Sequence, residues 1–110
     1  MKYYEYLNFN SADLFTVICL PDESGKFPTI VRRDPYVDAD EFLGEDEIVA
    51  TFAESVEKWT SHGYAVVYQH CRGRGKSSGE CIPYINERED GLFLQDWIRK
   101  QSFYNGELYI

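Results

Sequence analysis

The sequence predicts an α/β fold, with a mostly parallel sheet, two flanking helices and an N-terminal antiparallel β region. Two observations support this prediction. Apolar runs rich in β-branched and aromatic residues alternate along the chain with segments of helical periodicity. From residue 27 onward the order is strand, helix, strand, helix, strand, which is typical of parallel strands with helices packed across them. A chain of 110 residues is long enough for one such domain and too short for two.

The first two predicted strands cover residues 13–21 and 27–33. The sequence DLFTVICLP has the β-branched and aromatic residues that strands favour, and it ends at a turn sequence, PDESG. The sequence FPTIVRR follows, with Pro28 confined to its first residues, where a strand tolerates proline. The next residues, RDPY, are predicted to form a loop, because a residue that precedes proline avoids helical angles.

Helical periodicity predicts the first helix over residues 46–61. Its apolar residues share one face of the helix: Ile48, Phe52, Val56 and Trp59. Charged residues lie away from that face, as they do in an amphipathic surface helix. Gly63 follows the last turn, at the place where a left-handed residue commonly ends a helix.

A buried strand, a glycine-rich loop, a second helix and a last strand complete the chain. The run YAVVYQH, residues 64–70, is almost continuously apolar, as expected of a parallel strand covered on both faces. Asn86 and Glu89 have the spacing of a capping box and mark the start of the second helix. The apolar stripe of that helix comprises four residues: Phe93, Leu94, Trp97 and Ile98. The last strand is predicted in ELYI, residues 107–110, and we expect it to be buried in the sheet.

The charge and the cysteine content exclude several classes of function. The formal net charge is −8, and acidic residues crowd the segment between residues 37 and 58. Such a field repels nucleic acid and anionic membranes, so neither is an expected partner. No apolar run is long enough to span a bilayer and no secretory signal begins the chain, so a cytoplasmic location is expected. Three cysteines without C-x-x-C spacing argue against a disulfide framework or a zinc site: Cys19, Cys71 and Cys81.

The loop that follows the buried strand, HCRGRGKSSGE, is partly similar to a phosphate-binding loop. Residues 75–77, Gly-Lys-Ser, match the second half of the Walker A pattern, but His70 occupies the position of its first glycine. The dinucleotide fingerprint G-x-G-x-x-G also fails, because residue 78 is serine. In both motifs a helix begins at the loop, whereas here the stretch ECIPYI intervenes. The favoured interpretation is a strand-to-helix turn in which Arg72 and Arg74 are held by nearby carboxylates or carbonyls.

Taken in order, these segments resemble the Xaa-Pro dipeptidyl-peptidase and cocaine esterase (CocE/NonD) family of α/β-hydrolases. The resemblance covers most of the chain from residue 27 to residue 110. It is strongest in R-G-x-G-x-S-x-G, residues 72–79, and in E-x-E-D-G-x-x-x-x-x-W-I, residues 87–98. One departure is His70, where relatives often carry an acidic residue. The resemblance implies an N-terminal portion of an α/β-hydrolase domain that includes its third to fifth strands and their two helices.

The resemblance also implies the chemistry of the parent protein. Such enzymes use a serine nucleophile, a histidine base and an orienting aspartate to cleave esters, amides or Xaa-Pro peptides by acyl transfer. The serine lies in an elbow directly after the fifth strand, and the acid and the histidine follow it in sequence. That strand corresponds to residues 107–110, so we expect residues 1–110 to be a single fragment that ends before the nucleophile and is inactive alone.

Tyr36 is the one catalytic group that the resemblance assigns to this chain. In the cocaine esterase branch a tyrosine after the third strand donates its hydroxyl to the oxyanion hole, and Tyr36 of RDPY stands at the matching position. A neutral phenol is able to donate a hydrogen bond to the developing alkoxide. The alternative is that Tyr36 only packs beside Pro35 in a tight turn.

The sequence offers no substitute catalytic site. His70 and Cys71 are adjacent on a strand, so their side chains point to opposite faces and do not pair. His62 adjoins a helix end, where a histidine often binds the last carbonyls, and Ser77 and Ser78 have no evident base. We therefore expect no metal, no cofactor and no cysteine-histidine enzyme. Small-molecule esters, amides or peptides are the expected substrates of the intact enzyme.

Two other hypotheses remain open. In the first, the chain is a non-catalytic module that forms a homo-oligomer through an exposed sheet edge. The reason for this hypothesis is that the fifth strand lacks its usual neighbour, and a strand with unpaired amides pairs with another chain. In the second, the glycine-rich loop binds a nucleotide despite its incomplete motif.

Overall fold

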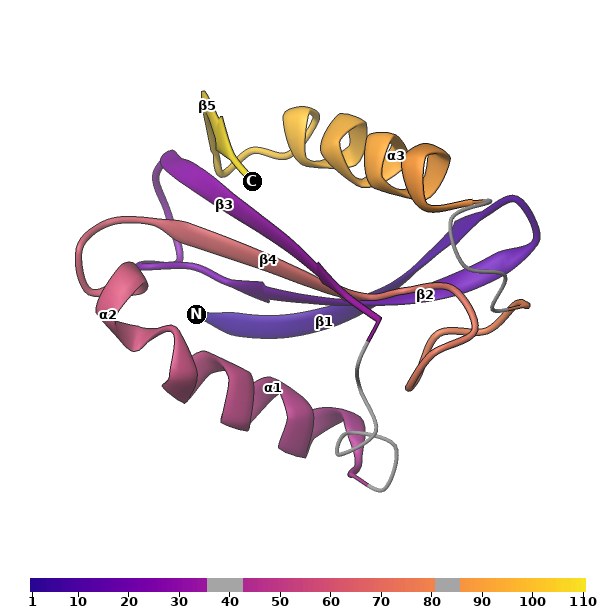
Figure 1. The fold of residues 1–110 in the computed structure, drawn as a ribbon. Coiled ribbons are helices and arrows are strands. Elements are labelled where there is room, and N and C mark those ends of the chain that lie inside the picture. The colour runs from indigo at the N-terminus through magenta and orange to yellow at the C-terminus, as the bar shows by residue number, and fades with distance from the viewer. Residues whose placement is uncertain (36–42, 81–85) are drawn as a thin grey trace.

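A computed structural model describes residues 1–35, 43–80 and 86–110. These residues form a five-stranded sheet with helices on both faces; in Figure 1, α3 lies above the sheet and α1 and α2 lie below it. The strands are β1 (Lys2–Phe9), β2 (Ala12–Cys19), β3 (Phe27–Asp34), β4 (Ala65–His70) and β5 (Tyr104–Tyr109). The helices are α1 (Glu45–Ser55), α2 (Glu57–Thr60) and α3 (Glu87–Arg99).

The strand order in the sheet is β1-β2-β4-β3-β5. β1 pairs with β2, and β2 with β4, in antiparallel fashion, whereas β3 pairs in parallel with both β4 and β5. The predicted antiparallel start and parallel remainder are therefore confirmed. Asn10 and Ser11 join β1 to β2 with φ angles of +47° and +65°, the left-handed pair that a tight hairpin turn requires. β4 lies between β2 and β3, so these two strands, which are consecutive in the sequence, are separated in the sheet.

β4 is buried on both faces, as its continuous apolar run predicted. Alternate side chains of a strand point to opposite faces, and β4 contributes Ala65 and Val67 to the core beneath α3 and Val66 and Tyr68 to the core beside α1. The α3 core also contains Leu7, Ile18, Leu20, Val31, Leu94, Ile98 and Phe103. The α1 core also contains Phe15, Val17, Cys19, Ile48, Val49, Phe52 and Val56.

The predicted helix over residues 46–61 is two helices. α1 ends at Ser55, and the next residue, Val56, has φ −108° and ψ 11°, outside the ordinary helical range. The Ser55 hydroxyl donates to the Phe52 carbonyl at 2.7 Å, a side-chain bond of the kind that bends helices. The predicted apolar face is buried as far as Val56. The prediction is wrong for Trp59, which is 44% exposed because the break changes the direction of the chain.

The two predicted helix termini had different outcomes. Gly63 has φ +89°, so the predicted left-handed residue after the first helical segment is confirmed. The predicted capping box is wrong, because Asn86 makes no side-chain cap bond. The Asn86 backbone already lies in the helical region, whereas a side-chain cap needs an extended residue. None of the described helices is long and apolar enough to cross a membrane.

β5 is a strand, as predicted, but it is not buried. Among the described residues it lies at the edge of the sheet and pairs only with β3, with an irregular register between Phe27 and Thr29. Tyr109 is 49% exposed, and Ile110, just beyond the strand, is 91% exposed. The burial prediction is wrong because a strand with one neighbour is covered on one side only.

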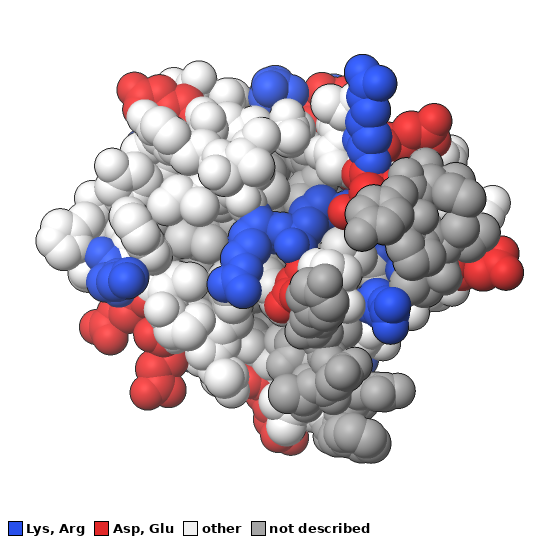
Figure 2. All heavy atoms as spheres, in the orientation of Figure 1, with Lys and Arg blue, Asp and Glu red and all other residues white. Residues whose placement is uncertain are grey.

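Charged side chains are mixed on the face of the molecule that Figure 2 shows. A band of lysine and arginine side chains crosses the middle of this face, aspartate and glutamate side chains lie next to it and around the rim, and much of the rest of the face carries neither charge.

Candidate functional site

The carboxyl ends of β3 and β4 lie side by side, because the two strands pair in parallel up to Asp34 and His70. β3 leads to Pro35 and then to Tyr36, and β4 leads to the glycine loop, which we define as residues 71–80. Ligands of open α/β sheets bind outside this edge. Tyr36, the predicted oxyanion donor, lies outside the described residues, so its role stays a prediction.

The backbone amides of the glycine loop bind acceptors within the protein. Six of them donate at 2.9–3.1 Å: Cys71 to Asp34 O, Gly73 to Ser78 O, Arg74 to Cys71 O, Lys76 to His70 Nδ1, Ser77 to Arg74 O and Ser78 to Asp13 O. A phosphate-binding loop instead points its amides at the ligand. The loop is therefore a structural turn, which is the interpretation that the incomplete motif favoured.

Two serines attach the glycine loop to the start of β2. The buried Ser77 hydroxyl accepts from the Phe15 amide at 2.8 Å and donates to the His70 carbonyl at 2.7 Å. The exposed Ser78 hydroxyl accepts from the Asp13 amide at 2.8 Å. Both hydroxyls stabilise backbone, and neither contacts a base that is free to activate it.

We expect the Ser77→Ala substitution to lower the free energy of unfolding by about 1–3 kcal/mol, because it leaves buried backbone groups of Phe15 and His70 without a partner. Urea unfolding followed by circular dichroism measures the loss. Ser78→Ala is the matched control, since it removes a similar bond where water replaces the hydroxyl, and we expect less than about 1 kcal/mol. Equal losses in the two variants would contradict the role given to burial.

Arg72 joins the two motifs that carried the family resemblance. Its Nε and Nη2 donate to the two carboxylate oxygens of the fully buried Asp90, at 2.9 and 2.8 Å. Nη2 and Nη1 also donate to the carbonyls of Phe9 and Asn10, at 2.9 and 3.1 Å. The hydrogen bonds that Arg72 donates to Asp90 raise the pKa of Arg72, so the guanidinium stays charged. A Cβ on Gly79, whose φ is +96°, would lie 2.8 Å from Arg72 Cγ, so glycine is required there.

The predicted anchoring of the loop arginines is thus confirmed for Arg72. It is wrong for Arg74, whose exposed side chain bonds to none of the described residues. Arg74 lies at the outer bend of the loop, where water solvates a guanidinium without a protein partner.

A second buried arginine, Arg33, was not singled out from the sequence. Its Nε donates to Gln69 Oε1 at 2.8 Å, and its Nη1 donates to Glu87 Oε1 at 2.9 Å. Its Nη2 is buried without a hydrogen-bond partner, 4.0 Å from Asp90 Oδ2. Gln69 Nε2 in turn donates to Thr16 Oγ1 at 3.0 Å. The signal available in the sequence was the arginine pair RR, residues 32–33, at the end of a predicted strand.

The cysteines and histidines of the described residues form no catalytic pair. Cys19 and Cys71 are free and buried, and burial raises the pKa of their thiols to about 11 and about 12. Both thiols are therefore protonated at neutral pH, and a protonated thiol is a poor nucleophile. His62 Nδ1 donates to the Lys58 carbonyl at 2.7 Å, as expected for a histidine at a helix end. Cys81 lies outside the described residues.

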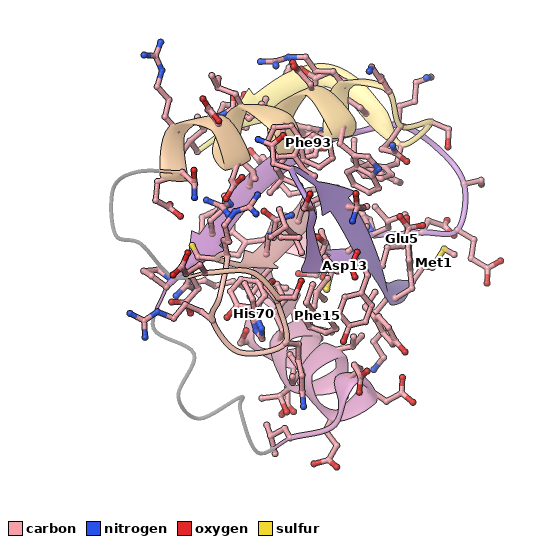
Figure 3. All side chains as sticks on the ribbon, turned by 90° about the vertical axis from the view of Figure 1, so that its right-hand side faces the viewer. Met1, Glu5, Asp13, Phe15, His70 and Phe93 are labelled. Carbon is pink, nitrogen blue, oxygen red and sulfur yellow. The ribbon has the colours of Figure 1, made fainter. Side chains whose placement is uncertain are left out.

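His70 and Cys71 face opposite sides of the sheet, as predicted. His70 is fully buried and lies against Phe15, with 5.0 Å between the ring centroids, on the side of α1. Figure 3 shows these two rings together below the sheet, with Phe93 above it under α3. The described residues also bring no three His, Cys, Asp or Glu side chains together in an arrangement that could hold a metal ion.

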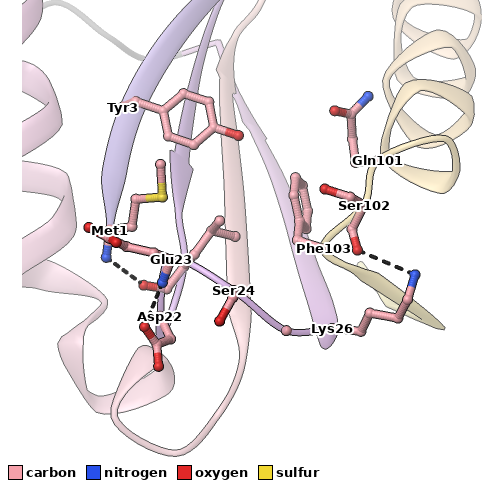
Figure 4. Close-up of a pocket in the computed structure, with 11 residues that line it drawn as sticks. Met1, Tyr3, Asp22, Glu23, Ser24, Lys26, Gln101, Ser102 and Phe103 are labelled. Atoms are coloured by element: carbon pink, nitrogen blue, oxygen red, sulfur yellow. Dashed lines mark hydrogen bonds between the residues drawn. The ribbon is translucent and has the colours of Figure 1, made fainter.

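The surface also has a hollow at the opposite end of the sheet, with a volume of about 460 Å³ (Figure 4). Its two cationic groups have partners: the Met1 ammonium donates to the Leu20 carbonyl at 3.0 Å, and Lys26 Nζ donates to the Ser102 carbonyl at 3.4 Å. The hollow lies at the amino ends of the parallel strands, away from the edge where α/β proteins bind ligands. It is not part of the candidate site.

Comparison with solved structures identifies the class of fold. A CocE/NonD family hydrolase from Staphylococcus aureus matches 97% of this chain with a TM-score of 0.74 and 21% identity, over 22% of that protein. An aminopeptidase from the marine sediment archaeon Thaumarchaeota archaeon matches 98% of this chain with a TM-score of 0.72 and 19% identity, over 20% of that protein. At such identities the likeness shows the fold alone. The described residues form part of an α/β-hydrolase fold.

Comparison of sequences identifies the family within that class. The family model of the X-Pro dipeptidyl-peptidase (S15 family) matches residues 11–108. Cocaine esterase from Rhodococcus sp. (strain MB1 Bresler) is 31% identical over 88 residues, which cover 80% of this chain and 14% of that protein. This chain therefore belongs to the X-Pro dipeptidyl-peptidase (S15) family, as its motifs predicted. It spans only a small part of the length of these relatives.

Proposed function

We propose that this chain supplies part of the sheet and one side of the oxyanion hole of a serine hydrolase. The intact enzyme cleaves esters, amides or Xaa-Pro peptides by acyl transfer, and Tyr36 donates a hydrogen bond to the oxyanion. The nucleophile, the acid and the histidine come from a segment that follows residue 110. The match of the S15 family model to residues 11–108 is the observation that carries this proposal.

The geometry of the candidate site is consistent with this division of roles. Tyr36 follows the last residue of β3 by two positions in the sequence, and the carboxyl end of β3 lies at the edge at which open α/β sheets bind ligands. Ser77 and Ser78 bind backbone groups of β2, and His62 binds a helix carbonyl. These side chains therefore stabilise the fold. In the proposed function, other residues carry out the acyl-transfer chemistry.

The chemistry requires a donor that is already in place when charge develops on the substrate. Attack of a serine on the carbonyl carbon produces a tetrahedral intermediate with a negative oxygen. A neutral hydroxyl held at hydrogen-bond distance stabilises this oxygen more than it stabilises the carbonyl of the ground state. A tyrosine suits this role, since its phenol stays protonated at neutral pH.

We expect residues 1–110 alone to show no saturable hydrolysis of nitrophenyl acetate and no covalent labelling by a fluorophosphonate probe. The reason is that the proposal places the activated serine outside them. Mass spectrometry of the treated chain measures labelling at any serine. Stoichiometric labelling of Ser77 or Ser78 in this chain would overturn the proposed division of roles.

The complementary experiment uses the longer protein. Reading the coding DNA beyond Ile110 shows whether a G-x-S-x-G-like elbow follows β5 directly. The protein expressed from that reading frame is expected to react with the same probe at the elbow serine. Its Ser→Ala variant at that position is the matched control and is expected to remain unlabelled.

A second candidate function is self-association, and the exposed edge of β5 favours it. In the part of the chain that the structure describes, β5 has a neighbour on one side only, and the apolar residues at its end are exposed: Tyr109 and Ile110. An unpaired strand edge of this kind pairs with another chain. Multi-angle light scattering of residues 1–110 distinguishes the cases: a dimer supports the second candidate, and a monomer at high concentration contradicts it.

A further inference from the structure

Three aromatic side chains form a row on the α1 side of the sheet, from α2 to β5. The Trp59 ring of α2 meets the Tyr64 ring edge-on, with 6.0 Å between centroids, and Tyr64 meets the Tyr109 ring of β5 at 6.3 Å. Ile30 of β3 pairs with Tyr109 and packs against the α1 core. We define these four residues, Ile30, Trp59, Tyr64 and Tyr109, as the aromatic face.

The aromatic face is in contact with solvent. Tyr109 points to the α1 side, because its neighbour Leu108 packs against the α3 core and successive side chains of a strand point to opposite faces. Trp59 and Tyr109 are 44% and 49% exposed. In Figure 2, much of the left-hand half of the molecule, where Figure 1 places α2 and β5, carries no charged side chain. Exposed apolar side chains that contact one another mark an interaction surface.

Helices cover the α1 side of the sheet only in part. α1 packs against β1, and α2 packs against β4. The residues that the structure describes place no helix over β5 on this side, whereas α3 lies on the other side of the sheet (Figure 1). Parallel strands are normally covered on both faces, and in α/β proteins helices form the cover. The aromatic face is therefore the part of this side that lacks its helix layer.

Cationic groups flank the aromatic face on two sides. Lys58 Nζ lies 5.5 Å from the centroid of the Trp59 ring. The exposed Arg32 follows Ile30 by two positions on β3, so it points to the same side of the sheet. A hollow of about 410 Å³ adjoins the face, lined by Lys58, Trp59, His62 and Tyr64. A partner that fits this surface has an apolar stripe and acidic groups beside it.

We propose that a helix from the segment that follows residue 110 packs across the aromatic face. This inference rests on the proposed function in one respect, since that proposal also places a segment after residue 110. The matched relatives are long enough to provide such a helix, because this chain covers 14% of cocaine esterase and 22% of the CocE/NonD family hydrolase. The occupant is thus a later part of the same polypeptide, and not a second protein.

The dimensions of the aromatic face suit an amphipathic helix. Two or three turns of helix span about 11–16 Å, enough to cross a row of three rings whose neighbouring centroids lie 6.0 and 6.3 Å apart. The apolar stripe of such a helix contacts the rings, and its polar side remains in water. Lys58 and Arg32 favour aspartate or glutamate at the two borders of that stripe.

The test is site-specific photo-crosslinking in the longer protein, with Trp59 replaced by benzoylphenylalanine. We expect a crosslink within one chain, which mass spectrometry maps to residues after 110. The same replacement at Tyr6 is the matched control, because Tyr6 is 42% exposed but lies on β1, at the opposite edge of the sheet. We expect its yield to be at least tenfold lower. A crosslink from Trp59 to a second chain, or none at all, would overturn the inference.

A second measurement leaves the side chains unchanged. Hydroxyl-radical footprinting compares the oxidation of Trp59 and Tyr109 in residues 1–110 with that in the longer protein. We expect both residues to be oxidised at least fivefold more slowly in the longer protein, and Tyr6 to change by less than about twofold. Protection of Trp59 that appears only as the protein concentration rises would assign the face to a second copy. Equal oxidation of Trp59 in the two proteins would also contradict the inference.

The failure of this inference is distinguishable from the failure of the proposed function. A longer wild-type protein that resists the fluorophosphonate probe contradicts the proposed function, whatever covers Trp59. A longer protein that is labelled and active, but in which Trp59 stays as accessible as in residues 1–110, contradicts the helix alone.

Discussion

Replacing Asp90 with alanine is expected to lower the free energy of unfolding by about 3–5 kcal/mol, because it leaves a buried guanidinium without its counter-charge. Asp90 accepts two hydrogen bonds from Arg72, and their side chains are 1% and 9% exposed. The substitution also leaves Arg33 Nη2 farther from any negative charge, since Asp90 Oδ2 is 4.0 Å away in the native protein. Urea unfolding, with the midpoint and the slope fitted separately, measures the effect.

Asp96→Ala is the matched control for this prediction. Asp96 lies in the same helix and contacts Arg99 at 3.3 Å, but the two side chains are 70% and 48% exposed. Exposed ion pairs contribute little, so we expect a change within about 0.5 kcal/mol. Similar losses in both variants would show that the loss comes from the helix and not from the buried pair.

The sequence predicted the elements whose signals are local. The strand containing Val66 and Val67 was recognisable because burial on both faces requires a continuous apolar run. The position of that strand between β2 and β3 was not recognisable from the sequence, because strand pairing depends on residues far apart in the chain. The helix break at Val56 was also not predicted. The apolar residues keep their helical spacing across it, although the backbone leaves the helical conformation there.

The candidate site shows the same division between local and distant signals. The glycine spacing around Arg72 predicted a turn with anchored arginines, but the partner Asp90 is 18 residues away and became evident only from the folded chain. Tyr68 had the pattern of an ordinary core residue in an apolar strand. Its hydroxyl donates a hydrogen bond to Asp34, which lies 34 residues earlier in the sequence. Side-chain hydrogen bonds between strands have no periodicity that a sequence displays.

We expect the Tyr36→Phe substitution in the longer protein to lower kcat for an activated ester by about 10²- to 10³-fold, with KM nearly unchanged. Removing one oxyanion-hole donor typically costs about 2.7–4 kcal/mol of transition-state stabilisation. The substitution keeps the aromatic ring and removes only the hydroxyl, so the loss of kcat reports on the hydrogen bond. Steady-state kinetics with nitrophenyl acetate measures both constants.

Tyr104→Phe is the control for the Tyr36 prediction, because it removes a phenol at the amino end of β5, far along that strand from the candidate site. We expect its kcat to stay within about twofold of the wild type. The urea midpoint of Tyr36→Phe separates the two roles considered for this residue. A lowered midpoint with kcat near the wild-type value indicates that Tyr36 only packs in the turn. An unchanged midpoint with a greatly reduced kcat indicates that its hydroxyl acts on the reacting oxygen, because only a transition-state interaction lowers kcat without altering stability or substrate binding.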